Sequence, residues 1–267
     1  MQLFYRKFGT KEGSPVLIIL HGLYGSSDNW ISLARELESY FTVIIPDLRN
    51  HGNSFHSKIH SYEAMADDLY DLLESFPDEK FIIMGHSMGG KVAMRFALKY
   101  PELLENLIVV DIAPVNYNKT YSIEVSSKHE LILEAMQKID PSKFKNRKSI
   151  ESELRLKVSD AMLPKFLLKN VKRNKEGTFF WRLNLQTLID SLPELMDGFS
   201  KEAHSSNVPV VFIKGENSPY IMDDYMTHIS RIFPDNQLVT IPDSGHLLHI
   251  EQPELFFKTF IYITDLA

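Results

Sequence analysis

Short, uniformly apolar runs recur along the chain, and amphipathic stretches separate them. Six runs contain almost no polar side chain, as expected of strands buried on both faces of a sheet. They lie at 15–20, 41–46, 80–85, 107–112, 208–215 and 237–242. A seventh run at 3–9 alternates apolar and polar residues, which is typical of an outer antiparallel strand. Amphipathic segments of helical length lie at 28–39, 61–75, 88–100, 219–233 and 251–265.

This alternation of strand and helix predicts an α/β fold, a doubly wound, mostly parallel sheet of about eight strands. The alternation stops between about 115 and 205, where the pattern is mostly helical and contains no buried-strand run. We therefore expect an α/β core formed by 1–114 and 206–267, with 115–205 as a helical cap (lid). The cap should stand over the carboxyl edge of the sheet, where ligands bind in open α/β folds.

Composition narrows the possible functions. A chain of 267 residues with 44% hydrophobic and 24% charged residues suits one large domain with an insertion. The net charge of −6 argues against nucleic-acid binding, although the segment 115–205 carries +4 and the remainder −10. The absence of cysteine excludes disulfides, thiolate zinc sites and cysteine nucleophiles. With no long apolar run and no signal-peptide pattern, we expect no membrane span and a cytoplasmic location.

A serine lies at a turn between a predicted strand and a predicted helix. The turn reads "GHSMGG" (85–90), with Ser87 at its centre. Such a strand–serine–helix turn, a nucleophile elbow, is so tight that the residues two before and two after the serine must be small. Gly85 and Gly89 meet that requirement. The backbone N–H of Met88 then lies at a helix N-terminus, where it would stabilise developing negative charge.

A second glycine-rich loop, "HGLYGS" (21–26), directly follows the strand at 15–20. Gly22 and Gly25 would let this backbone approach a substrate closely. Paired with Ser87, the loop indicates an oxyanion hole, in which the N–H of Leu23 is the second donor.

The segment "DSGHLLHIEQPELF" (243–256) follows the last predicted strand and supplies a candidate base. A loop at this position can return an imidazole over the sheet edge to Ser87, so His246 is the candidate. His249 is the rival in the same segment, but it precedes the final helix and is expected to be a helix-start or packing residue.

Several segments carry a wider resemblance when they are taken in chain order. They are "HGLYGSSDNW" (21–30), "PDLRNHGNS" (46–54), "GHSMGGKVAM" (85–94), "VVDIAPVNY" (109–117), "GENSPY" (215–220) and "SGHLLH" (244–249). Together they resemble the α/β-hydrolase-fold serine hydrolases over nearly the whole chain. More narrowly, they resemble the bacterial YbfF-type esterases, which are related to the eukaryotic ABHD11-like hydrolases.

The position of the triad acid departs from the wider family. Most members place it in the loop after the strand that precedes the histidine strand, which here reads "KGENSPY". That loop offers Asn217 and Ser218 where an aspartate is expected. Glu216 is expected to point away, and Asp223 and Asp224 lie too far along the next helix. An uncharged residue cannot stabilise an imidazolium as a carboxylate does, so an acid is needed from elsewhere.

Asp111, at the end of the strand beside that of Ser87, is the favoured acid because it can approach the imidazole from the neighbouring strand. The narrower resemblance implies the same position and places Ser218 near the histidine as an auxiliary hydrogen-bonding group. A strand-end aspartate can also simply cap its loop. Asp47 ends another central strand and is a third option, although "PDLRNHG" more often resembles a structural turn.

These residues predict a carboxylic ester hydrolase with the triad Ser87, His246 and Asp111 and an acyl-serine intermediate. The expected substrates are small to medium acyl esters, with acyl thioesters such as acyl-CoA as a further class. The segment 165–175 holds five basic residues in eleven, and a solvated helix face explains this run better than a docking surface for coenzyme A. No metal or organic cofactor is expected. The alternatives are a C–C bond hydrolase or haloperoxidase on the same fold, or a slow-turnover ligand receptor. Candidates for the substrate pocket are Tyr24, Tyr117, Phe179, Phe180 and Trp181.

Overall fold

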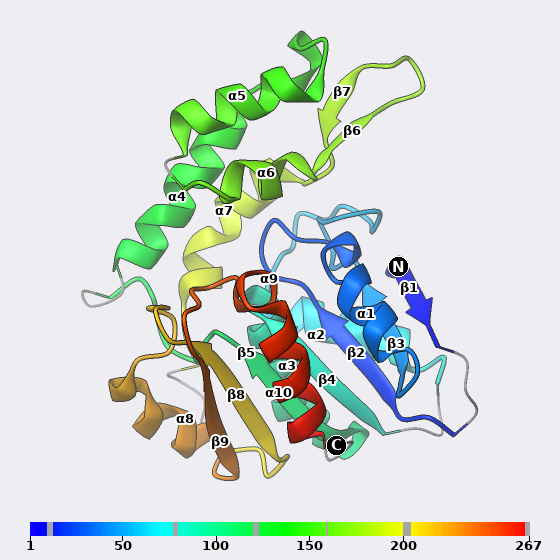
Figure 1. Ribbon diagram of the computed structural model, residues 1–267, viewed down its shortest axis with the longest axis vertical. Coiled ribbons are helices and arrows are strands. Elements are labelled where there is room, and N and C mark those ends of the chain that lie inside the picture. Colours follow the sequence, from blue (N-terminus) through cyan, green and yellow to red (C-terminus); the bar gives the residue numbers. More distant parts are fainter. Residues whose placement is uncertain (10–12, 77–79, 120–122, 159, 200–203, 265–267) are drawn as a thin grey trace.

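A seven-stranded sheet forms the centre of the computed structural model, which describes residues 1–9, 13–76, 80–119, 123–158, 160–199 and 204–264 (Figure 1). The strand order is β1-β3-β2-β4-β5-β8-β9. β1 pairs antiparallel with β3, and the other neighbours are parallel. The strands are β1 (Tyr5–Phe8), β2 (Val16–Leu20), β3 (Thr42–Pro46), β4 (Phe81–His86), β5 (Leu104–Val110), β8 (Val210–Gly215) and β9 (Asn236–Ile241).

The predicted α/β fold is confirmed. Each of the six apolar runs and the alternating run at 3–9 forms a strand, although the sheet has seven strands instead of about eight. The main correction to the expected helices is at their ends. In the segment 219–233 the first four residues are not helical, and a 3₁₀ turn at Asp223–Tyr225 precedes α8 (Met226–Ile232). The helix expected at 251–265 is α10 (Pro253–Ile263), and a separate short helix, α9 (Leu248–Glu251), precedes it. Proline favours the first position of a helix, so Pro253 starts a new helix instead of continuing the old one.

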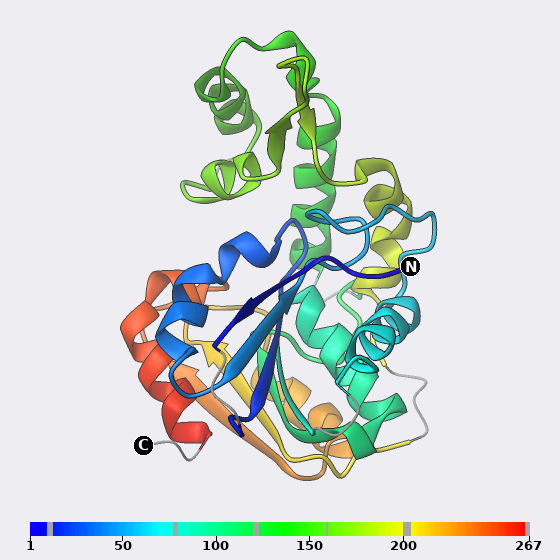
Figure 2. The same cartoon turned by 90° about the vertical axis from the view of Figure 1, so that its right-hand side faces the viewer.

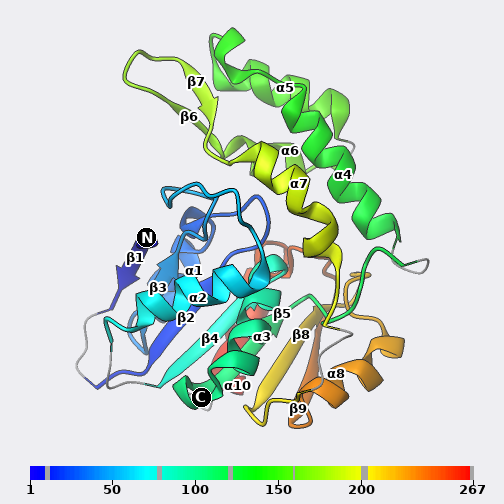
Figure 3. The ribbon, with the colours of Figure 1, turned by 180° about the vertical axis from the view of Figure 1, so that it is seen from behind.

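Helices cover both faces of the sheet (Figures 1 and 3). The alternation of side chains along β2 shows why: Ile18 and Leu20 belong to one apolar cluster, and Leu17 and Ile19 to the other. The first cluster includes α2 (Tyr62–Leu73), α3 (Met88–Lys99) and α8. The second includes α1 (Ile31–Leu37) and α10. A strand buried on both faces must be apolar throughout, which is the pattern that the sequence carries.

The chain between β5 and β8 rises above the carboxyl edge of the sheet (Figures 1 and 2). It contains α4 (Ile123–Gln137), α5 (Arg147–Lys157), α6 (Leu163–Leu168), β6 (Val171–Arg173), β7 (Phe179–Trp181) and α7 (Leu185–Met196). The ribbon formed by β6 and β7 was not expected. Each of its strands has three residues and includes exposed positions, so it lacks the long apolar run that identifies a buried strand.

A buried lysine joins this segment to the helix that follows Ser87. Lys91 is 1% exposed, and its ammonium donates to the carbonyls of Val115 (3.2 Å), Leu195 (3.4 Å) and Asp197. Val115 lies where the chain leaves the sheet after β5, and the other two carbonyls lie where α7 ends. One cation therefore holds both connections of the inserted segment against α3.

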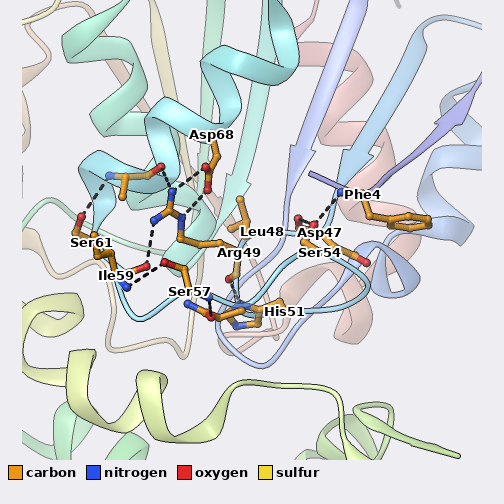
Figure 4. A network of polar contacts seen from close by, with 12 residues as sticks. Phe4, Asp47, Leu48, Arg49, His51, Ser54, Ser57, Ile59, Ser61 and Asp68 are labelled. Carbon is orange, nitrogen blue, oxygen red and sulfur yellow. Dashed lines mark hydrogen bonds and ion pairs between the residues drawn. The ribbon is translucent and has the colours of Figure 1, made fainter. Parts of the chain in front are cut away.

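A buried ion pair organises the loop between β3 and α2 (Figure 4). Arg49 forms a bidentate contact with Asp68, at 2.5 Å from Nε to Oδ2 and 2.7 Å from Nη2 to Oδ1. The same guanidinium donates to the carbonyls of Ile59 (3.1 Å) and Ala64 (3.0 Å). Because its donors meet carboxylate and carbonyl oxygens, the buried charge is compensated, and the loop is fixed against α2.

Candidate active site

Ser87 occupies the turn between β4 and α3 in a strained backbone conformation. Its φ is +53° and its ψ is −121°, a region that non-glycine residues rarely adopt. The turn is too tight for side chains at the flanking glycines. A Cβ on Gly85 would lie 2.2 Å from the carbonyl oxygen of Gly89, and one on Gly89 would lie 2.5 Å from that of Leu20. The glycine spacing read from the sequence is therefore a steric requirement, and strain of this kind is typical of functional sites.

The loop after β2 lies directly against this serine. A Cβ on Gly22 would lie 3.1 Å from the Cβ of Ser87 and 3.0 Å from Nδ1 of His86, so glycine permits the close approach. The N–H of Gly25 donates to the carbonyl of Gly22 at 2.9 Å and closes the turn. Leu23 and Met88, the predicted oxyanion donors, line with Ser87 a small cavity of about 10 Å³. A cavity of that size accommodates about one water-sized group.

His246 and Asp111 meet across the carboxyl edge of the sheet. Nδ1 of His246 lies 2.7 Å from Oδ2 of Asp111. Asp111 follows β5, has a φ of +52° and is fully buried. Its backbone N–H donates to the carbonyl of Ile213 in β8 at 2.8 Å, which fixes the aspartate between two strands.

Hydrogen bonds surround the carboxylate of Asp111. The hydroxyl of Ser218 donates to Oδ2, and the N–H of Gly215 donates to Oδ1 at 3.1 Å. Burial raises the pKa of Asp111 to about 6, while these two donors act in the opposite direction because they favour the ionised form. Burial also lowers the pKa of His246 below its ordinary value of 6.5, so its imidazole is neutral at neutral pH. A neutral imidazole is the form that can accept a proton.

Two residues that the sequence reasoning missed hold the loop of His246. The carboxylate of Glu251 accepts from the N–H groups of Gly245 (2.7 Å) and Leu247 (3.2 Å), one on each side of the histidine. Nε2 of His86 lies 2.8 Å from the carbonyl oxygen of His246, and burial lowers the pKa of His86. An acidic residue five positions after a candidate base has no special meaning in the sequence, so only the folded loop reveals its role.

The rival acids lie elsewhere. Asp47 accepts from the N–H groups of Ser27 (2.6 Å) and Asn53 (2.7 Å), so both of its oxygens organise loops. Glu216 accepts from the N–H of Asp243 at 3.0 Å. Asp223 and Asp224 are exposed in the 3₁₀ turn before α8. The rival base, His249, lies in α9 and stacks on Trp30 with ring centroids 4.2 Å apart.

A cavity of about 450 Å³ lies between the sheet edge and the inserted segment, and Ser87 and His246 both line it. Tyr24 lines this cavity, as proposed for substrate contact. Tyr117 instead lines the small cavity and donates its hydroxyl to the carbonyl of Tyr220 at 2.6 Å. Trp181 lines neither cavity, because its indole N–H is directed to the carbonyl of Ile139 at 2.9 Å.

Within the ranges that the structure describes, no cluster of three or more His, Asp or Glu side chains is arranged to hold a metal ion. Over the same ranges, no helix combines the length and the apolar character needed to cross a membrane.

The fold, with a serine in a strand-to-helix turn, defines the class of α/β hydrolases. The chain belongs to the alpha/beta hydrolase fold family, whose model matches residues 15–253. It is similar to a structure described as a marine microorganism esterase, with 45% identity, a TM-score of 0.93 and 98% of each chain covered.

Two curated relatives extend this result. The mouse (Mus musculus) sn-1-specific diacylglycerol lipase ABHD11 is 38% identical over 244 residues, which are 91% of this chain and 78% of that protein. The Escherichia coli (strain K12) esterase YbfF is 33% identical over 255 residues, which are 95% of this chain and 94% of that protein. The protein is therefore a hydrolase of this fold, and its relatives include esterases and a lipase.

Proposed function

We propose that the protein is a serine carboxylesterase that hydrolyses small to medium acyl esters through an acyl-enzyme on Ser87. The observation that carries the proposal is the contact of 2.7 Å between Nδ1 of His246 and the carboxylate of the buried Asp111. The same imidazole lines a cavity together with Ser87. A nucleophile in a strained turn, a neutral base and a buried carboxylate that orients the base are the three parts of serine acyl transfer.

The reaction follows from these roles. His246 takes the hydroxyl proton as Oγ of Ser87 bonds to the acyl carbon, and Asp111 stabilises the imidazolium. The N–H groups of Leu23 and Met88 hold the oxyanion, which is the largest electrostatic contribution in such sites. The bond from carbon to the leaving oxygen then breaks, and the imidazolium returns its proton to the departing alcohol. Water, activated by His246, hydrolyses the acyl-serine and restores the free hydroxyl.

Apolar residues of the inserted segment make up much of the cavity wall and support an acyl group as its occupant. They are Val125, Ile132, Met162, Leu163 and Phe166. A volume of about 450 Å³ is near the lower end of the usual range for ligand pockets, which favours small to medium substrates. Esterase and diacylglycerol lipase, the activities for which these relatives are named, belong to the same reaction class.

Acyl-CoA remains a second substrate class within the proposal, and it is less well supported. The basic side chains of the 165–175 segment are exposed, and none of them lines the cavity. A simultaneous change of Lys169, Lys172 and Arg173 to methionine tests this class. If CoA docks there, KM for acyl-CoA rises and KM for a neutral ester stays constant. Equal effects on both substrates remove the docking idea.

The deciding experiment is a panel of p-nitrophenyl acetate, p-nitrophenyl butyrate and acyl-CoA thioesters, measured with the unaltered protein, Ser87→Ala and Ser152→Ala. Ser152 is exposed on α5 and serves as the matched control. We expect multiple turnovers with the esters, loss of nearly all activity in Ser87→Ala, and no change in Ser152→Ala. Activity that survives Ser87→Ala would eliminate the nucleophile. Stoichiometric binding without turnover would instead identify a ligand receptor.

A further inference from the structure

Tyr24 is held in an unfavourable backbone conformation by contacts from the inserted segment. Its φ is +65°, in the left-handed region that favours glycine, and it directly follows Leu23, the proposed oxyanion donor. The side-chain amide of Asn170, between α6 and β6, donates to the carbonyl of Tyr24 at 2.7 Å. The phenol of Tyr24 lies 3.2 Å from Nδ1 of His129 in α4 and 3.3 Å from the carbonyl oxygen of the same histidine.

His129 also contacts a second tyrosine that lines the same cavity. Its Nε2 lies 2.9 Å from the hydroxyl of Tyr220, and the ring of Tyr220 stacks on that of His246 with centroids 3.7 Å apart and planes at 14°. The backbone of Tyr220 is held as well, since its carbonyl accepts from Tyr117 and its N–H donates to Ser218. His129 thus lies between the oxyanion loop and the residue that packs on the proposed base.

One assignment of protons gives every polar side-chain atom of Tyr24, His129 and Tyr220 a hydrogen-bond partner. Burial lowers the pKa of His129 to about 3, so the ring is neutral, with one N–H and one acceptor nitrogen. If Nδ1 carries the proton, it donates to the phenol of Tyr24, which in turn donates to the carbonyl of His129. Nε2 then accepts from the hydroxyl of Tyr220. The opposite tautomer leaves that hydroxyl proton without a described acceptor, so the network favours the first.

We propose that His129 is a positioning residue through which the inserted segment aligns the oxyanion loop with the base. The proposal rests on the roles assigned above to Leu23 and His246. Its physical basis is that a side chain with two opposed nitrogens fixes two tyrosines, one adjacent to each half of the site. A misplacement of about 1 Å in either half is enough to reduce turnover by roughly 10²-fold.

The test separates the two nitrogens of His129. The polar atom of an asparagine side chain overlies the position of Nδ1, and that of glutamine overlies Nε2. His129→Asn therefore keeps the contact with Tyr24, His129→Gln keeps the contact with Tyr220, and His129→Leu keeps neither. With p-nitrophenyl acetate, which is too small to reach much of the cavity, we expect His129→Leu to lower kcat by about 10- to 100-fold, with KM within about threefold. Each polar variant should recover part of the loss.

Tyr220→Phe removes one oxygen and keeps the stacked ring, so it tests the same contact with little risk to folding. It should lower kcat in the unaltered protein and in His129→Gln, but not in His129→Asn, where the contact is already absent. His56→Gln is the matched control. His56 is an exposed histidine of the loop between β3 and α2, its Nε2 lies 3.1 Å from the carbonyl oxygen of Arg182 in the inserted segment, and it lines neither cavity.

Two results overturn the proposal. One is a rise in KM at constant kcat, which would make His129 a substrate contact only. The other is an equal loss in all three His129 variants, or an equal effect of Tyr220→Phe in every background, which would indicate general packing. Ser87→Ala is measured in parallel. Activity in that variant refutes the proposed function, whereas an inactive Ser87→Ala beside a fully active His129→Leu refutes this inference alone.

Discussion

Nδ1 of His246 lies 2.7 Å from Oδ2 of Asp111, although 135 residues separate the two in the chain. The carboxylate comes from the end of β5, adjacent to the strand of Ser87, and not from the end of β8, where the wider family places its acid. The loop after β8 contributes Ser218 to the same carboxylate instead. Two neighbouring strand ends thus together hold His246.

Asp111→Asn should lower kcat by roughly 10⁴-fold, because an amide can neither fix the required tautomer nor balance the imidazolium. Ser218→Ala removes a single hydrogen bond to the carboxylate and should cost about 3- to 10-fold. Glu216→Gln is the control and should leave turnover unchanged. Steady-state kinetics on p-nitrophenyl butyrate measure all three variants. An Asp111→Asn enzyme with near-normal kcat would show that another residue supplies the acid.

Acid should inactivate the pair formed by His246 and Asp111. The active form has a neutral imidazole and an ionised carboxylate, so a proton added to either group abolishes it. Because burial raises the pKa of Asp111 to about 6 and lowers the pKa of His246, kcat/KM should fall below about pH 6 and be constant above about pH 7. A profile of kcat/KM against pH provides the measurement. An acid limb centred well above pH 7 would contradict the assignment.

Lys128 should influence the position of that limb. It lines the cavity and lies 3.6 Å from Asp160, and its positive charge lowers the pKa of His246 by disfavouring the imidazolium. Because a nearby cation disfavours a proton on either member of the His246–Asp111 pair, Lys128→Met should let the pair bind a proton more readily and move the acid limb to higher pH, with a smaller effect at high salt. Lys138→Met is the matched control, because Lys138 is an exposed lysine that follows α4, and this variant should leave the acid limb in place.

Loss of the buried ion pair should strongly destabilise the fold. The side chains of Arg49 and Asp68 are 11% and 7% exposed, so Asp68→Asn leaves a buried guanidinium without its anion. We expect the free energy of unfolding to fall by about 3–5 kcal/mol. Asp67→Asn breaks the exposed pair with Lys99 and should change it by less than about 1 kcal/mol. Urea unfolding followed by circular dichroism compares the two variants, and similar losses would refute the distinction.

Lys91 should make stability depend on pH in the alkaline range. Burial lowers the pKa of Lys91 in the folded protein to about 7, against 10.5 for an ordinary lysine. Between these values the unfolded chain binds a proton that the folded protein lacks, so this residue's contribution to stability rises with pH. The free energy of unfolding of Lys91→Met, relative to the unaltered protein, should therefore decline from pH 7 to pH 10. Lys148 is exposed, so Lys148→Met is the control, and its free energy of unfolding relative to the unaltered protein should not change with pH over this range.

Much of the site was accessible from local sequence because local sterics determine it. Strands buried on both faces must be apolar throughout, and this pattern located six strands of the sheet, while the alternating run at 3–9 located β1. The turn around Ser87 tolerates only glycine at two flanking positions, so its spacing identified the turn before any fold was known. The short exposed strands β6 and β7 bury too little to leave a comparable pattern, and they were not found.

The contacts of His129 and Tyr220 remained hidden because no local rule specifies them. Tyr220 ends the segment "GENSPY" (215–220), whose notable feature in the sequence is the missing aspartate, and His129 lies in a helical segment with no motif. Their contacts depend on how α4 descends onto the loops of the sheet. Trp181 was chosen as an aromatic residue of the inserted segment, but its indole is directed to Ile139 instead of into either cavity.

The sequence by itself therefore determined the α/β architecture, the serine turn and the segment that carries the histidine, since burial and steric limits act over a few neighbouring residues. The sequence named Asp111 as the favoured partner of His246, but only the tertiary structure decided between it and its rivals and showed how the inserted segment reaches both halves of the site. Asp111 and His246 are brought together by the order of strands in the sheet, and strand order is a property of the whole chain.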